Sequence, residues 1–136
     1  MWLKEKLSIK QWIPILQNKM FSRRAFGREA ENRARRYLKK KGYQFIEANY
    51  YTKDGEIDLI FKDRNYLVFV EVRAKRNITF GRPEETIDQK KIERCKKAAQ
   101  KYLYHKQIES LCRFDVLAVT YLDKKWSYHH FINAFE

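Results

Sequence analysis

Two acidic side chains lie in neighbouring apolar segments of this chain, at a spacing that allows them to act together. Asp58 stands in GEIDLI (residues 55–60), and Glu71 stands in VFVEVRAK (residues 68–75). Both segments are rich in Val, Ile, Leu and Phe, which favours β-strands over 56–62 and 66–74. Because alternate side chains of a strand share a face, we expect Glu71, Arg73 and Lys75 to lie together.

A tight turn would bring the two acids opposite each other. If Arg64 and Asn65 form a two-residue hairpin loop, the numbers of paired residues add up to 129. The predicted pairs are Phe61–Val68, Leu59–Val70, Asp58–Glu71 and Glu56–Arg73. This register also places Ile57, Leu59 and Phe61 on one apolar face, which a slip by one residue would destroy.

Opposed carboxylates on a half-buried sheet repel each other, at a cost of roughly 0.2–1 kcal/mol that grows when water is excluded. Arg73 and Lys75 could balance this charge by themselves. A divalent cation is the sharper hypothesis, since Mg²⁺ takes one or two carboxylates together with waters and a substrate phosphate. Asp58, Glu71 and the carbonyl of Val72 would then hold Mg²⁺ or Mn²⁺, an ion that activates water and shields a phosphate.

The same residues resemble a known signature. Asp58 followed by Glu71-Val72-Arg73 is similar to the catalytic motif of the PD-(D/E)XK nuclease superfamily, with Arg73 at the lysine position. Together with GREAE (27–31), YL (37–38), GY (42–43) and RFDV (113–116), the ordered set resembles the bacterial YraN family of uncharacterised, endonuclease-like proteins. The resemblance implies an α/β fold with a restriction-endonuclease-like αβββαβ core, in which helices flank a mixed sheet. It also implies similarity to Holliday-junction resolvases. The activity that it implies for this chain is that of a metal-dependent DNA endonuclease selective for branched structures.

The resemblance assigns roles to individual residues. Glu31 is the distal acid, Asp58 the central metal ligand and Glu71 the second ligand. Arginine stays protonated and cannot abstract a proton, so Arg73 would hold a phosphate or stabilise developing charge. Lys75, or Lys91 early in the second long helix, could take the role of the missing lysine.

The rest of the chain predicts one α/β domain over 23–136. We expect helices over 22–41 and 87–106, and strands over 43–50, 56–62, 66–74, 113–121 and 126–134. Gly42 stands where a left-handed helix cap is wanted, and Thr86 with Gln89 forms a capping box. Asp115 is expected to pair with Arg113 or Arg73, and the histidines at 129 and 130 to lie on a strand surface.

The charge balance indicates a polyanionic partner. The 136 residues contain 30 Lys and Arg against 17 Asp and Glu, a net charge of +13. Nucleic acid, most plausibly DNA, is the first candidate, an anionic membrane the second and an acidic protein the third. Both helices are basic, and the candidate phosphate contacts are Arg28, Arg35, Lys91 and Arg94, which would position a backbone without reading its sequence.

The N-terminal residues 1–22 are interpreted as an amphipathic leader, which either covers an apolar edge of the domain or binds a membrane surface or a partner. No apolar run approaches the ~20 residues that span a bilayer, so stable membrane insertion is not expected. Two cysteines without a CxxC motif favour a reduced, cytoplasmic protein. A homodimer is expected from the resolvase resemblance alone. The alternatives to an enzyme are a catalytically silent nucleic-acid-binding module and a docking factor that acts through the leader.

Overall fold

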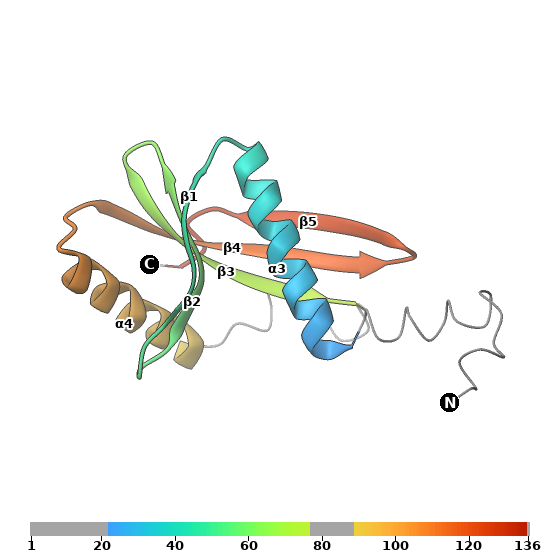
Figure 1. The fold of residues 1–136 in the computed structure, drawn as a ribbon, viewed down its shortest axis with the longest axis horizontal. Helices are drawn as coiled ribbons and strands as arrows, with labels where there is room; N and C mark the ends of the chain where they lie inside the picture. Colours follow the sequence, from blue (N-terminus) through green and yellow to red (C-terminus); the bar gives the residue numbers. More distant parts are fainter. Residues whose placement is uncertain (1–21, 77–88, 136) are drawn as a thin grey trace, which may run out of the picture.

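The computed structural model describes residues 22–76 and 89–135. Along the chain (Figure 1), the elements are α3 (Arg23–Lys40), β1 (Gln44–Tyr51), β2 (Glu56–Asp63), β3 (Tyr66–Lys75), α4 (Gln89–Lys106), β4 (Leu111–Leu122) and β5 (Lys125–Phe131). This order confirms the predicted αβββαβ core and the further strand that was predicted after it. Residues 1–21 of the predicted leader, and the predicted cap at Thr86, lie outside the described residues.

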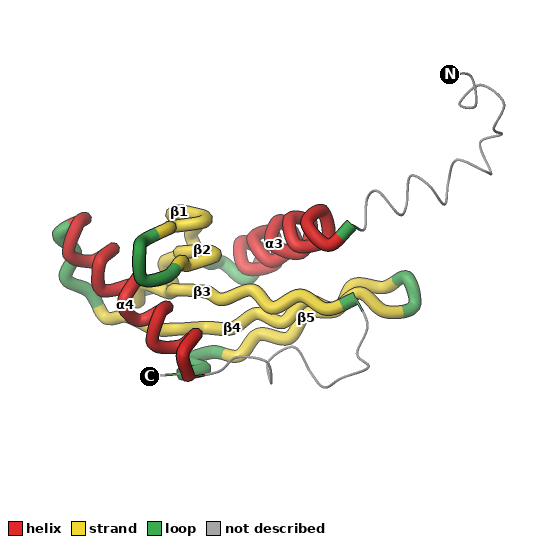
Figure 2. Tube along the Cα trace, turned by 90° about the horizontal axis from the view of Figure 1, so that it is seen from below, coloured by secondary structure: helices red, strands yellow, loops and turns green. Residues whose placement is uncertain are grey.

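The five strands form one mixed sheet in the order β1-β2-β3-β4-β5. Neighbouring strands of the sheet run antiparallel, except for β3 and β4, which run parallel and are joined through α4. The tube view shows α3 and α4 on different sides of the sheet (Figure 2). Each helix seals its own apolar cluster, one between α3 and the sheet and one between α4 and the sheet.

The helix α3 begins and ends where its sequence dictates. The Ser22 hydroxyl accepts a hydrogen bond from the Ala25 N–H at 3.2 Å, which satisfies one of the free donors of the first turn. Gly42 follows the helix with φ +96°, a conformation that glycine adopts without steric cost. The buried residues of the helix are Phe26, Ala30, Ala34 and Leu38, which recur at helical spacing on one face.

The β2–β3 hairpin has the predicted register. Leu59 pairs with Val70 and Phe61 with Val68, and the loop contains Arg64, whose φ is +56°. The ladder ends at Leu59–Val70, however, so Asp58 and Glu71 are not ladder partners. Beyond this point β2 stays paired with β1 only.

This divergence of β2 from β3 corrects two further expectations. Glu56 pairs with Tyr51 of β1 and not with Arg73. Ile57 joins the cluster beneath α4, whereas Leu59 and Phe61 belong to the cluster beneath α3. The prediction of a single apolar face through Ile57 was wrong because it assumed that the flat alternation of a paired strand continues past the last ladder pair.

The C-terminal part corrects the interpretation of His130. Its side chain is 3% exposed, and its Nε2 lies 2.7 Å from Asp115 Oδ2, so the predicted surface position was wrong. Arg113 binds both oxygens of Asp115 at 2.9 Å, which selects it over Arg73 as the partner. The strand β5 ends at Phe131, earlier than predicted, because the Asn133 N–H turns back to donate to Asp115 at 3.0 Å.

Candidate active site

The opening between β2 and β3 holds the central acid. Asp58 Oδ2 accepts a hydrogen bond from the backbone N–H of Val72 at 2.8 Å, just beyond the last β2–β3 pair. The N–H and C=O groups of one residue in an extended strand point to the same edge. The Val72 carbonyl is therefore directed toward the same opening as Asp58.

Glu71 lies in this opening, beneath the first turns of α4. Its side chain is 4% exposed, and its Oε1 lies 3.1 Å from Lys91 Nζ and 3.6 Å from an Arg73 guanidinium nitrogen. Its other oxygen, Oε2, is buried and has no hydrogen-bond partner among the described residues. A buried carboxylate oxygen without a partner is costly, and it marks a place where a donor or a cation would stabilise the fold.

The electrostatics of Asp58 follow from this environment. Burial, followed by repulsion from the Glu71 carboxylate, raises the pKa of Asp58 well above its usual value. The Val72 N–H opposes this rise, and the charge of Glu31 adds to it. The charges of Asp58 and Glu71 thus repel each other across the opening, although the two residues are not ladder partners.

Glu31 reaches the edge of this group from α3. Its Oε1 accepts a hydrogen bond from the Asn49 side chain at 2.8 Å, and burial raises its pKa despite that bond. The sequence interpretation missed Asn49. The residue type at position 49 could have indicated an irregular backbone there, because asparagine tolerates the left-handed conformation that Asn49 adopts with φ 54°.

The cations of the site are Lys91 and Arg73. Burial alone would lower the pKa of Lys91, but the charge of Glu71, its hydrogen bond with Lys91 and the charge of Asp58 together outweigh burial, and the pKa is raised. In this arrangement Lys91 is a cation that can hold or orient a phosphate, and not a base. Lys91 therefore does point back to the acids, as the sequence interpretation expected.

Lys75 is placed differently. It pairs with Thr120 at the end of the β3–β4 ladder, and the described residues show no hydrogen bond or ion pair between its side chain and the acids. Cys95 also lies near the group, but burial and then the Glu71 charge raise its pKa to about 12, which keeps the thiol protonated and unreactive.

The donor set suits one particular type of cation. Within residues 22–76 and 89–135, no three His, Cys, Asp or Glu side chains converge on a common ion position. The carboxylates at the opening between β2 and β3 are therefore the pair Asp58 and Glu71. Such a set fits Mg²⁺, which keeps several waters, and the unpartnered Glu71 Oε2 together with the raised pKa of Asp58 supports the fit.

The predicted phosphate contacts on the helices differ in their surroundings. Arg28 on α3 and Arg94 on α4 are exposed. Arg35 is half-buried, with its guanidinium 4.4 Å from the ring centre of Phe45. Lys91, as described above, belongs to the acid site itself.

A mixed sheet between two helices, with an acid pair where β2 and β3 separate, defines a restriction-endonuclease-like α/β fold. Residues 30–119 match the model of the uncharacterised protein family UPF0102. The chain belongs to this family, which confirms the resemblance to YraN-like proteins.

Curated relatives cover most of the chain. A UPF0102 protein of Carboxydothermus hydrogenoformans is 36% identical over 116 residues, which is 85% of this chain and 98% of the relative. A UPF0102 protein of Shewanella denitrificans is 42% identical over 100 residues, or 74% of this chain and 93% of the relative. A third, from Syntrophomonas wolfei, is 40% identical over 117 residues, or 82% of this chain and 98% of the relative.

Membrane association by a spanning helix has no support in the described segments. None of the helices there is both long enough and apolar enough to cross a bilayer.

Proposed function

We propose that this protein is a Mg²⁺- or Mn²⁺-dependent DNA endonuclease that prefers branched structures. The observation that carries the proposal is the pair formed by half-buried Asp58 and buried Glu71, in which Glu71 Oε2 has no partner among the described residues and the pKa of Asp58 is raised. Two mutually repelling acids held together where two strands separate are typical of a functional site, because such pairs cost stability.

Asp58, Glu71 and the carbonyl of Val72 are the residues that would hold the ion, which supplies activation of water and neutralisation of the phosphate charge. Lys91 keeps its proton and stands 3.1 Å from Glu71, so it orients the attacked phosphate or stabilises its developing charge. Arg73 acts in the same way. Glu31, held by Asn49, is the distal acid that would position the attacking water.

Binding is proposed to come from the basic helices. Arg28 and Arg94 are exposed and can meet phosphates, which gives an affinity that depends on salt and little on sequence. The preference for branched DNA rests on the resemblance to Holliday-junction resolvases. The homodimer and the cytoplasmic location expected from the sequence stay predictions.

A second function has its own support. Glu71 Oε1 already contacts Lys91 and Arg73, so two cations can balance its charge without a metal ion. With arginine in place of the motif lysine, a catalytically silent DNA-binding module is the alternative.

Cleavage assays on a panel of DNA substrates separate the two functions. The purified protein is incubated with four-way junctions, flapped duplexes, nicked duplexes and single strands, each with Mg²⁺, with Mn²⁺ and with EDTA. Metal-dependent cutting of a branched substrate supports the enzyme. If no substrate is cut with either metal while binding persists, the silent module is the better account.

A further inference from the structure

A pocket of about 370 Å³ opens beside the acid site, between the β1–β2 turn and the first turns of α4. Its lining includes Tyr51, Lys53, Gly55, Lys91 and Arg94. Lys91 also contacts Glu71 at 3.1 Å, so the pocket and the acid site share one wall. A molecule whose phosphate lies at the acids therefore has its next unit within reach of this pocket.

The turn that forms one wall is rigid. The Thr52 hydroxyl accepts hydrogen bonds from the N–H groups of Asp54 and Gly55, both at 3.1 Å, and donates to the Gly55 carbonyl at 2.8 Å. Gly55 lies so close to α4 that a Cβ there would approach the Arg94 carbonyl oxygen to 2.8 Å. The absence of a side chain at Gly55 thus allows the turn to rest on the helix, and the pocket is formed before any ligand binds.

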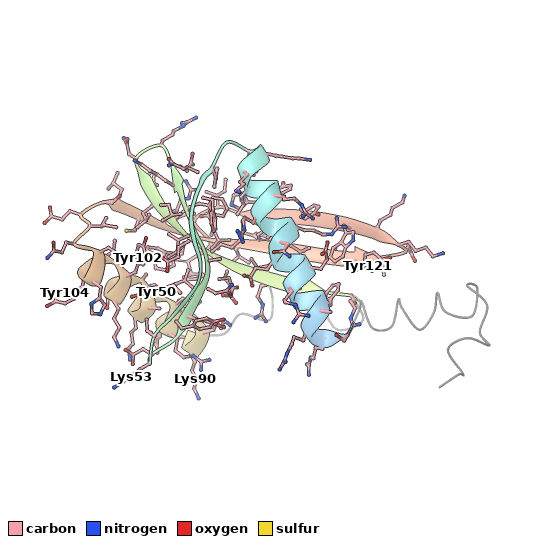
Figure 3. The ribbon with its side chains drawn as sticks, viewed as in Figure 1. Tyr50, Lys53, Lys90, Tyr102, Tyr104 and Tyr121 are labelled. Atoms are coloured by element: carbon pink, nitrogen blue, oxygen red, sulfur yellow. The ribbon has the colours of Figure 1, made fainter. Side chains whose placement is uncertain are left out.

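The charge of the pocket suits an anion. Of the two acids in its lining, Asp54 is bound to Lys101 at 2.7 Å. The other acid, Glu56, shares the lining with Lys53, Arg94 and Lys91, the last of which also contacts Glu71. The stick view shows the labelled side chains of Lys53 in the turn and Lys90 in the first turn of α4 at the same end of the molecule (Figure 3). A phosphate at the mouth of the pocket would meet several cations.

The pocket also carries an aromatic side chain that the fold does not use. Tyr51 is 69% exposed at the end of β1, although its neighbour Tyr50 packs edge-on against Tyr102 with ring centres 5.1 Å apart. An exposed tyrosine beside cations is the combination with which proteins bind single-stranded nucleic acid, because every base offers a face for stacking.

We propose that this pocket receives one unpaired nucleotide of the substrate strand, with its base stacked on Tyr51 and its phosphate held by Lys53 and Arg94. The inference rests on the proposed function, and it adds the feature of the substrate that is recognised. Fully paired duplex cannot place a base there without breaking a pair, whereas a flap or a junction supplies an unpaired nucleotide at no such cost.

Equilibrium binding of the full chain in EDTA tests the proposal. The probes are a flapped duplex and a blunt duplex of the same paired sequence, each with a fluorescent label. Tyr51→Ala should weaken flap binding about 5- to 30-fold and leave duplex binding unchanged, because only the flap offers a base to stack. Tyr51→Phe, which keeps the ring, should bind like the wild type.

Tyr104→Ala is the matched control, since Tyr104 is 80% exposed and lies in the last turn of α4, away from the pocket. It should bind both probes normally. Ultraviolet cross-linking to a flap with 5-iodouracil at the first unpaired position should modify Tyr51, as identified by mass spectrometry.

Several results would overturn the proposal. Tyr51→Ala could lose affinity equally for flap and duplex, or lose affinity for neither. The wild type could fail to bind the flap. Micromolar thymidine monophosphate could displace the flap, which would indicate a site for free nucleotides. Cleavage that depends on Asp58 but not on Tyr51 would refute the pocket assignment alone. Flap binding that depends on Tyr51, by a protein that cuts no substrate, would refute the nuclease alone.

Discussion

Replacing Asp58 with asparagine removes the charge that repels the buried carboxylate of Glu71 and keeps the size of the side chain. The asparagine oxygen can still accept the Val72 N–H, which bonds Asp58 at 2.8 Å. Its amide can also donate to Glu71 Oε2, the buried oxygen that has no partner among the described residues. The change should therefore stabilise the metal-free protein, whereas most substitutions at buried positions destabilise.

The magnitude follows from two contributions. In general, two like charges repel by roughly 4 kcal/mol at about 4 Å and an effective dielectric constant near 20. Between Asp58 and Glu71, the cations Lys91 and Arg73 cancel part of such a repulsion. A donor for a buried unpaired oxygen recovers up to about 1–3 kcal/mol. We expect a net gain of about 2 kcal/mol in the free energy of unfolding at pH 7.5. For a domain of this size, that corresponds to a rise of roughly 7 °C in Tm.

The pH dependence gives a second check on the sign of the change in stability. The pKa of Asp58 is raised in the folded state, so the wild type loses stability as the pH rises above about 4 and through the folded pKa. Asparagine does not titrate. The advantage of Asp58→Asn should be largest at pH 7.5 and should shrink steadily toward pH 4.5.

Thermal and urea denaturation in EDTA at pH 7.5, 6.0 and 4.5 measure this effect. Asp115→Asn is the matched control, because Asp115 is also buried but is held by Arg113 and His130. The control should lose stability. If Asp58→Asn is less stable than the wild type at pH 7.5, or if its advantage does not depend on pH, the description of the acid pair is wrong.

Four further outcomes are expected. Burial favours the protonated form of Asp115, but the hydrogen bonds from its partners outweigh burial and lower its pKa. The contribution of Asp115 to stability is therefore present above about pH 4 and is lost as the pH falls through the folded pKa. Asp115→Asn should cost about 3 kcal/mol in urea unfolding at pH 7 and much less at pH 3. Arg73→Lys, which restores the superfamily residue, should retain or increase cleavage, and a complete loss would contradict the proposed role of Arg73. Arg28→Ala should lower the slope of log K against log salt by about one without changing the preference among sequences, and a slope that is flat in the wild type would remove the nucleic-acid interpretation. Truncation before Ser22, which keeps the cap of α3, should leave cooperative unfolding intact, and a loss of cooperativity would show that the leader belongs to the core.

The sequence was sufficient for features that depend on local pattern. The register of the β2–β3 hairpin followed from the apolar alternation of Leu59, Phe61, Val68 and Val70, because any slip would have buried polar side chains. The end of α3 shortly before Gly42 followed from the conformational freedom of glycine. Both are short-range effects that neighbouring residues dictate.

Features that depend on contacts distant in sequence were not predicted. The separation of β2 from β3 after Leu59 places Ile57 beneath α4, and nothing in the alternation of β2 indicates where the pairing stops. The burial of His130 requires Asp115 on the neighbouring strand, a partner that sequence spacing does not reveal. For the same reason Lys91 was one of two candidates for the lysine role until α4 was seen to place it against Glu71.

Cleavage and binding of one flapped duplex, measured in parallel for the wild type and Asp58→Asn, test the central claim most directly. With Mg²⁺ or Mn²⁺, the wild type should cut the flap near the branch. Asp58→Asn should bind the flap with unchanged affinity but cut it at least about 100-fold more slowly. A loss of roughly 3 kcal/mol of transition-state stabilisation has that effect on the rate. Equal cutting by both proteins would contradict the account, because the activity would then not depend on the acid pair between β2 and β3.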